Sequence, residues 1–373
     1  MIQHTTIEIQ DFSLWDKMTA HRGLISFTLE VTARCNNDCR HCYINLPAED
    51  QYARSQELTL QEIGTLADQA VDLGAVWVLL SGGEPLLRDD FKEIYLLLKK
   101  KGLLVSVFTN ATLIRDEHIE LFKKYPPRDI EITVYGATQE TYERVTCRPG
   151  SFAAFKDGLT RLLESGVKVR LKAMAIRSNF QELGQITDFC RTHTKDYFRF
   201  DPQLHLRFDR NEKRNQLIKS ERLTPEQIVN LEREDDERFI ALQKGCDSFI
   251  NEDLSENCDD HLFQCGLGEG SISISYDGKF RLCSSLWALE TMYDLRQGSL
   301  HDAWENFVPK VRGMRSHSPD FLENCRSCPI INLCLWCPAH SYLETGELDT
   351  PIEYFCQVAR ARAALIQGEI KAG

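Results

Sequence analysis

Apolar runs alternate with helical patterns along the first half of the chain. Short runs rich in apolar and β-branched residues predict six strands, at residues 25–31, 75–80, 103–108, 130–135, 167–175 and 197–206. Apolar residues at helical spacing predict the helices between them, at residues 60–73, 90–100, 116–124, 151–164 and 179–192. The first helix begins at a capping box, Thr59 to Glu62, and ends before Gly74.

This alternation predicts an α/β fold with parallel strands. The continuous apolar run at residues 75–80 is typical of a strand buried on both faces of a parallel sheet. The pattern alone leaves two architectures open, an open doubly wound sheet and a barrel. In a barrel, chemistry takes place at the carboxyl ends of the strands, so side chains just after each strand are candidates for a site.

The second half of the chain changes character twice. Residues 207–257 are rich in charge, with a run from Glu232 to Arg238, and Thr224-Pro225 predicts a helix start. The run is interpreted as a solvated face, with the gripping of a basic peptide as the alternative. From residue 258 the cysteines crowd together and helical periodicity fades. We expect four parts: a segment 1–23, an α/β domain 24–206, a connecting segment 207–257, and a loop-rich domain 258–373.

Composition excludes several classes of protein. The net charge of −12 disfavours nucleic acid as a partner, because phosphate binding needs a basic face. No apolar run reaches the ~18 residues of a membrane span, and residues 1–16 lack the pattern of a signal peptide, so we expect a cytoplasmic protein without a membrane partner. Fourteen cysteines in such a chain are better explained by metal or cluster ligation than by disulfides.

Three of these cysteines, Cys35, Cys39 and Cys42, follow the first predicted strand with the spacing C-x3-C-x2-C. Thiolates are the soft ligands that iron–sulfur clusters and zinc prefer. A four-iron cluster held by three thiolates would keep one iron open for a small molecule. The alternative is a zinc loop completed by a distant fourth ligand, for which His41 is a candidate.

The loop resembles the signature of radical S-adenosylmethionine (SAM) enzymes, with His41 where that family usually has an aromatic residue. The resemblance implies a [4Fe–4S] cluster on the three cysteines, with the amino and carboxylate groups of S-adenosylmethionine on the open iron. Reductive cleavage would then give a 5′-deoxyadenosyl radical that removes a hydrogen atom from the substrate. The family's fold, a partial (β/α)6 barrel, agrees with the number of predicted strands.

Other strand ends carry candidate residues for S-adenosylmethionine. Ser81-Gly82-Gly83-Glu84-Pro85 follows the second strand and resembles the family's Gly-Gly-Glu motif, although Gly-Gly alone is often only a turn. The polar ends of the third and fourth strands, and an arginine after the fourth, complete the set. The predicted cofactor-binding residues are Gly82, Gly83, Glu84, Asn110, Thr133 and Arg144. Arg148 is the alternate for Arg144, and Lys172 is the weakest candidate. No catalytic acid or base is predicted.

The cysteines after residue 258 resemble the SPASM domain, which carries auxiliary clusters in radical enzymes that modify peptides. The resemblance departs once, because two residues instead of three separate the third and fourth cysteines of the central run. It implies two auxiliary [4Fe–4S] clusters, one on Cys258, Cys265, Cys283 and Cys337, and one on Cys325, Cys328, Cys334 and Cys356. A zinc ribbon on two Cys-x2-Cys pairs is the alternative. The other thiols are Cys147, Cys190 and Cys246.

Together these features predict a radical SAM maturase that cross-links or oxidises a residue of a ribosomally made peptide or protein. A formylglycine-forming, sulfatase-maturing enzyme is the first alternative, and an iron–sulfur electron-transfer or zinc-scaffold protein is the second. The expected partners are the substrate and a reductant such as flavodoxin or ferredoxin. Because the predicted barrel begins near residue 24, no N-terminal leader-binding domain is expected. Either a separate leader-peptide recognition protein or direct gripping of the core peptide would then select the substrate.

Overall fold

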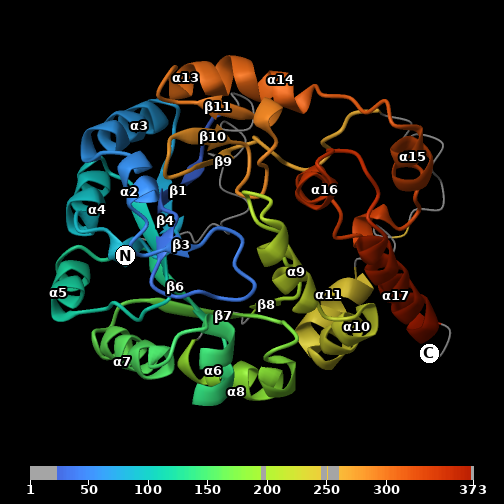
Figure 1. Cartoon of the computed structure of the whole chain (residues 1–373), viewed down its shortest axis with the longest axis horizontal. Helices are drawn as coiled ribbons and strands as arrows, with labels where there is room; N and C mark the ends of the chain where they lie inside the picture. The colour runs from blue at the N-terminus through green and yellow to red at the C-terminus, as the bar shows by residue number, and fades with distance from the viewer. Residues whose placement is uncertain (1–22, 195–198, 245–249, 251–259, 371–373) are drawn as a thin grey trace, which may run out of the picture.

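The computed structural model describes residues 23–194, 199–244, 250 and 260–370. These residues form one nine-stranded sheet with helices along its outer side (Figure 1). The sheet order is β11-β10-β9-β1-β4-β5-β6-β7-β8, and no pairing joins its two edges within the described residues. The expected partial barrel is therefore confirmed as the fold class.

Six strands of this sheet are parallel and follow one another in chain order. They are β1 (Ser26–Thr32), β4 (Trp77–Gly82), β5 (Leu104–Thr109), β6 (Asp129–Val134), β7 (Val169–Met174) and β8 (Arg199–Asp201). All six strands were expected from the sequence, but β8 ends at Asp201 instead of residue 206, and residues 197 and 198 of the expected strand lie outside the described residues. Pro202 has no N–H to donate to a neighbouring strand, so the ladder ends there.

Helices connect these strands as the apolar periodicity predicts. They are α3 (Leu60–Asp72), α4 (Phe91–Lys100), α5 (Asp116–Lys124), α7 (Ser151–Glu164) and α8 (Leu183–His193). The capping box of α3 is present: the Thr59 hydroxyl accepts the Glu62 N–H at 3.2 Å, and Glu62 accepts the Thr59 N–H at 2.7 Å. No helix within the described ranges is both long and apolar enough to cross a membrane.

Two short helices, α2 (Gln51–Gln56) and α6 (Gln139–Thr146), were not expected from the sequence. Each is started by a side-chain cap, because Asp50 accepts the Ala53 N–H at 2.8 Å and Thr138 accepts the Thr141 N–H at 3.3 Å. Helices of six and eight residues are too short to establish an apolar period, so only their caps could have revealed them.

The C-terminal region extends the barrel sheet. Its strands β9 (Ser271–Ile274), β10 (Lys279–Arg281) and β11 (Met292–Asp294) are antiparallel to one another, and β9 pairs in parallel with β1. A hydrophobic core continues from Leu80 in the barrel to Phe280 and Trp304. The expected boundary at residue 258 is therefore a boundary in sequence only, because the sheet and the hydrophobic core include residues from both sides of it.

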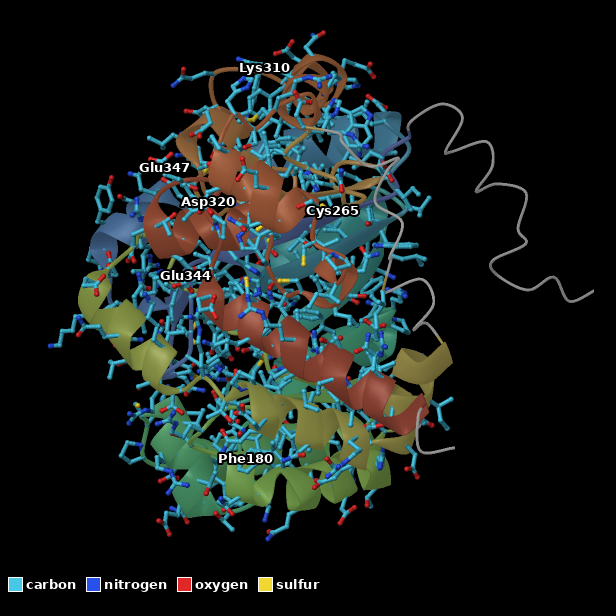
Figure 2. All side chains as sticks on the ribbon, turned by 90° about the vertical axis from the view of Figure 1, so that its right-hand side faces the viewer. Phe180, Cys265, Lys310, Asp320, Glu344 and Glu347 are labelled. Carbon is cyan, nitrogen blue, oxygen red and sulfur yellow. The ribbon has the colours of Figure 1, made fainter. Side chains whose placement is uncertain are left out.

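The remaining helices lie in the connecting segment (α9 to α11) and in the C-terminal region (α13 to α17). They are α9 (Glu212–Ser220), α10 (Pro225–Glu234), α11 (Asp236–Lys244), α13 (Leu300–Asp302), α14 (Val308–Arg312), α15 (Pro319–Phe321), α16 (Pro338–Thr345) and α17 (Glu353–Ile370). In Figure 2, α17 is the red helix that runs obliquely across the side of the molecule facing the viewer. The helix start at Thr224-Pro225 is confirmed, because Thr224 caps α10.

The charge run Glu232–Arg238 is not simply a solvated face. Glu232 is 1% exposed and accepts the Arg362 Nε–H at 2.9 Å, which joins α10 to α17. Arg238 approaches the same carboxylate at 3.2 Å. Because two guanidinium groups surround one buried carboxylate, the run contributes an internal connection between the central segment and the C-terminal helix.

We expect Gly158→Ala to destabilise the protein. A Cβ at Gly158, in the middle of α7, would lie 2.0 Å from the carbonyl oxygen of Ala111, in the turn that follows β5. Overpacking of this kind costs about 1–3 kcal/mol. Gly184→Ala is the matched control, since its Cβ meets nothing within 4 Å and should stabilise α8 by about 0.5–1 kcal/mol. Urea unfolding of both variants checks the pair, and equal effects would contradict the close approach.

Candidate functional site: the cysteine loop and its cavity

The loop that carries Cys35, Cys39 and Cys42 begins and ends in a short ladder. Strand β2 (Arg34–Cys35) pairs with β3 (Leu46–Pro47). Between them the loop is hydrogen-bonded to the end of α6, because the N–H of Asp38 donates to the Thr146 carbonyl and that of Arg40 to the Val145 carbonyl, both at 3.0 Å. These bonds fix the backbone that presents the three thiols.

The three thiols suit an iron–sulfur cluster. Cys39 is buried, and Cys35 and Cys42 are half-buried. Burial raises the pKa of the Cys35 and Cys39 thiols above their ordinary values, and the neighbouring thiolates raise both further. Grouped thiolates of this kind are stabilised when a metal cluster supplies the positive charge. The donor set therefore fits the cluster that the spacing predicts.

Gly82 and Gly83 bring β4 against the cysteine loop. A Cβ at Gly82 would lie 2.1 Å from the Thr32 carbonyl oxygen, and one at Gly83 would lie 2.3 Å from that of Arg34. The N–H of Gly83 donates to Thr32 at 2.7 Å. The glycines are thus required first by contact between two segments of the chain, and not only by the approach of a ligand.

Contrary to expectation, Glu84 does not line the cavity. It is fully buried, and its carboxylate accepts the Thr109 hydroxyl at 2.7 Å, the Asn110 N–H at 2.7 Å and the Leu86 N–H at 3.1 Å. Burial raises the pKa of Glu84 to about 7. These contacts connect the end of β4 to the end of β5, so Glu84 positions Asn110 instead of lining the cavity.

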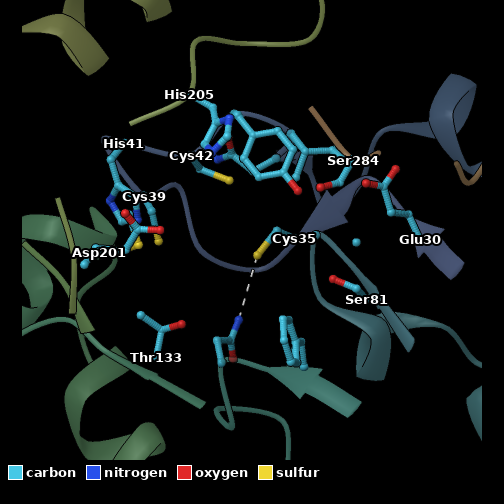
Figure 3. Close-up of a pocket in the computed structure, with 18 of the residues that line it drawn as sticks. Glu30, Cys35, Cys39, His41, Cys42, Ser81, Thr133, Asp201, His205 and Ser284 are labelled. Atoms are coloured by element: carbon cyan, nitrogen blue, oxygen red, sulfur yellow. Dashed lines mark hydrogen bonds between the residues drawn. The ribbon is translucent and has the colours of Figure 1, made fainter. Parts of the chain in front are cut away.

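A cavity of about 340 Å³ opens beside the loop, at the carboxyl ends of the strands. All three cysteines line it, together with four of the predicted cofactor-binding residues, Gly82, Gly83, Asn110 and Thr133. Asn110 Nδ2 approaches Cys35 Sγ at 3.8 Å, and Figure 3 shows this contact and Thr133 below the cysteines. The structure therefore brings these separate motifs together.

Arg144 lies outside this cavity. Its guanidinium donates to the Thr141 hydroxyl at 2.8 Å and to the Ser178 carbonyl at 2.9 Å. The alternate, Arg148, donates to the Asn36 carbonyl within the cysteine loop. Lys172 does line the cavity, where it pairs with Glu131 and lies over the Phe108 ring.

Several residues that line the cavity were not predicted from the sequence. His205 and Gln203 follow β8, Glu30 lies in β1, and Ser284 follows Cys283. His205 hydrogen-bonds Ser285 at 3.0 Å and His340 at 3.0 Å, and burial lowers its pKa to about 4. Only the position of His205 and Gln203 just beyond a strand end could have indicated them.

Comparison with known families agrees with this geometry. Residues 29–190 match the family model of the radical SAM superfamily. This part of the chain is a radical SAM domain. A [4Fe–4S] cluster and S-adenosylmethionine are accordingly its cofactors.

Two curated relatives match most of the chain. The AdoMet-dependent heme synthase of Methanosarcina barkeri is 25% identical over 337 residues, which cover 85% of this chain and 92% of that protein. The antilisterial bacteriocin subtilosin biosynthesis protein AlbA of Bacillus subtilis is 26% identical over 325 residues, covering 83% of this chain and 66% of AlbA. The chain thus spans just under two thirds of AlbA's length.

Among solved structures, Streptococcus suis SuiB bound to S-adenosylmethionine is similar in fold, with a TM-score of 0.63 and 15% sequence identity. The likeness covers 93% of this chain and 80% of SuiB. It therefore includes the region beyond the radical SAM domain.

The C-terminal cysteines fall into two sets. Four of them, Cys325, Cys328, Cys334 and Cys356, surround a cavity of about 310 Å³. In the other set, burial raises the pKa of the Cys337 thiol, and its neighbours Cys283 and Cys265 raise it further. Cys265 is labelled in Figure 2. Cys258 and Cys246 lie outside the described residues. No three His, Cys, Asp or Glu side chains in the described ranges are arranged to chelate a single metal ion. A cluster is larger, and each of its thiolates binds a different iron.

The raised pKa of Glu84 predicts a pH-dependent stability. The folded protein retains a proton on Glu84 that the unfolded chain releases above its ordinary pKa of 4.5. Relative to Glu84→Gln, wild type should therefore lose about 1–3 kcal/mol of unfolding free energy between pH 4.5 and about 7, with no further loss above that.

Urea unfolding of both proteins across this range measures the difference. Glu182→Gln is the control, because hydrogen bonds from Thr141, Thr138 and Ala137 lower the pKa of Glu182. The stability contributed by the Glu182 carboxylate should be present above pH 4.5 and lost as the pH falls. Parallel curves for wild type and Glu84→Gln would contradict the prediction.

Proposed function

We propose that this chain is a radical SAM maturase that removes hydrogen from a residue of a peptide, leaving a cross-link or an oxidised residue. One observation carries the proposal. Ser284 and Ser285, directly after Cys283, line the same cavity as the radical-cluster cysteines. A second group of cysteines thus adjoins the space where the substrate reacts, as an enzyme that must also remove an electron from its substrate requires.

Each part of the cavity has its own task. A reduced cluster and S-adenosylmethionine bound there would supply the radical chemistry that removes a hydrogen atom. Cys35, Cys39 and Cys42 would hold that cluster, and the Asn110 amide faces Cys35. Gly82, Gly83 and Thr133 line the cavity wall beside it. By fixing these groups on strand ends, the barrel aims the radical at one C–H bond and excludes competing reactions.

The C-terminal cysteines would hold two auxiliary [4Fe–4S] clusters. Cys325, Cys328, Cys334 and Cys356 around one cavity support the first assignment. Cys265, Cys283 and Cys337, with Cys258 as the fourth ligand, form the second set. The set that contains Cys283 is the nearer to the reaction cavity, so it would accept the electron from the substrate.

A peptide is the substrate class that the relatives favour. AlbA takes part in the biosynthesis of a bacteriocin, and SuiB is also known bound to the precursor peptide SuiA. We propose that a reductant such as flavodoxin or ferredoxin serves the radical cluster. Selection of the substrate falls to a separate leader-recognition protein or to direct contacts in the cavity.

A tetrapyrrole is the second candidate substrate. The heme synthase of Methanosarcina barkeri is matched over 92% of its length, more completely than AlbA. Its reaction class would use the same radical domain with a different occupant of the cavity. The sulfatase-maturing reaction and a pure electron-transfer role are further alternatives that the same experiments separate.

Iron analysis tests the ligand assignment. After anaerobic reconstitution, wild type should contain about twelve irons and the Cys35/Cys39/Cys42→Ala variant about eight, on four irons per cluster. Cys147→Ala is the control and should keep the full content, because the exposed Cys147 belongs to none of the three sets. Zinc in the C-terminal region, or only about four irons in wild type, would contradict the auxiliary clusters.

Product analysis tests the reaction. With S-adenosylmethionine, dithionite and a synthetic peptide encoded beside the gene, wild type should form 5′-deoxyadenosine and a peptide lighter by two hydrogen atoms. The triple cysteine variant should form neither. Absence of 5′-deoxyadenosine would indicate an electron-transfer or scaffold protein. Conversion of an iron-porphyrin, or an aldehyde at a Cys or Ser, would identify the tetrapyrrole or sulfatase-type reaction instead.

A further inference from the structure

One buried acid on the cavity wall has an oxygen without a partner. Glu30, near the end of β1, is 1% exposed and lines the cavity that holds the radical-cluster cysteines. Its Oε2 accepts a hydrogen bond from Arg281. Its Oε1 is buried and has no hydrogen-bond partner among the described residues.

Arg281 fixes this carboxylate in one orientation. Arg281 is itself fully buried in β10, and its second terminal nitrogen donates to the Ser284 carbonyl. Its guanidinium lies over the Trp287 ring, 3.6 Å from the centroid. The pair is joined through one oxygen only, since the Nε–H of Arg281 is also buried without a hydrogen-bond partner among the described residues.

The free oxygen of Glu30 lies between the loop that carries Cys35 and the segment that carries Cys283. Glu30 is in the strand that leads to Cys35, and its partner Arg281 lies two residues before Cys283. Figure 3 shows Glu30, Ser81 and Ser284 on the side of Cys35 opposite to Cys39 and His41. A substrate group that bridges the radical site and the auxiliary cysteines would pass this carboxylate.

A buried carboxylate oxygen without a hydrogen-bond donor is energetically costly, above all when the group is charged. Its position on the wall of a reaction cavity indicates that a substrate donor completes it. The chemistry of bond formation offers such a donor. Joining a carbon to a neighbouring X–H group, where X is sulfur, oxygen or nitrogen, releases the X–H proton.

We propose that Glu30 is the base that accepts this proton, an inference that rests on the proposed function. The C–H hydrogen atom leaves with the 5′-deoxyadenosyl radical, as 5′-deoxyadenosine. The resulting carbon radical bonds to X while the X–H proton moves to Glu30 Oε1. The remaining electron would go to the oxidised auxiliary iron–sulfur cluster that the Cys283 set would hold, and from there to an external one-electron carrier.

The groups around Glu30 are compatible with this role. Burial raises the pKa of Glu30 above its ordinary value, Arg281 opposes the rise, and Asp277 adds to it. Tyr43 and Tyr276 are further titratable groups close to Glu30. A carboxylate with a raised pKa is a more effective proton acceptor than an ordinary one. Product formation should accordingly decline as the pH falls and Glu30 becomes protonated.

Two variants separate a base from a structural ion pair. With the synthetic peptide that gives product, Glu30→Gln should raise the ratio of 5′-deoxyadenosine to product about 100-fold, the size typical of general base catalysis. Glu30→Gln alone leaves Arg281 unpaired, so Glu30→Gln/Arg281→Gln removes both charges together. The same high ratio in the double variant supports the base. A wild-type ratio in either variant overturns it, and iron content shows that the clusters are intact.

A labelling experiment tests the free oxygen without turnover. Dicyclohexylcarbodiimide, applied to the reconstituted protein without S-adenosylmethionine, should modify Glu30, as read by peptide mass spectrometry. Glu232 is the matched control, because it is equally buried but both its oxygens are bonded to Arg362. Equal labelling of both, or none at Glu30, would overturn the inference alone. Failure of wild type to form 5′-deoxyadenosine would overturn the proposed function and the inference with it.

Discussion

The site depends on a contact between two backbones at the carboxyl ends of β1 and β4. Gly83 donates to Thr32 at 2.7 Å, and Glu84 donates to Arg34 at 2.9 Å, so β4 holds the start of the cysteine loop. A side chain at Gly82 or Gly83 would collide with those carbonyls. The Glu84 carboxylate then accepts the backbone N–H of Asn110 at the end of β5, and the Asn110 side-chain amide contacts Cys35 Sγ. Three strand ends are thereby locked into one arrangement.

Most of the barrel could be predicted from the sequence because each strand and helix has its own local signal. The run at residues 75–80 and the cap at Thr59 required no knowledge of distant residues. The strand expected at 197–206 was too long because its apolar pattern continues past Pro202. The cysteine spacing likewise needed only local sequence, and the three thiols do line one cavity. The partition of the C-terminal cysteines stays a prediction, and Cys258 is not described.

The directions of the polar side chains were not predictable, since they depend on contacts distant in sequence. Glu84 follows two glycines, so it was predicted to bind an ammonium group, but its carboxylate accepts the backbone N–H groups of Leu86 and Asn110. Arg144 follows a polar strand end, but it lies outside the cavity. Glu30 sits in an apolar strand and gave no signal at all. Its importance appears only when Arg281, far along the chain, meets it.

Buried ion pairs hold the C-terminal region to the rest of the chain. Glu30 of the barrel pairs with Arg281, and Arg222 and Glu232 of the connecting segment pair with Glu344 and Arg362. Replacing such pairs by apolar residues is often neutral or stabilising, so stability alone does not explain three of them. For the Glu30–Arg281 pair, the position beside the cavity offers an explanation. Because β9 pairs with β1 and β10 runs back beside it, Arg281 and Cys283 reach the side of the barrel where β1 carries Glu30. The sheet extension thus places a charged pair, and the segment expected to accept an electron, beside the radical site. A proton and an electron that leave the substrate together would then depart through neighbouring groups.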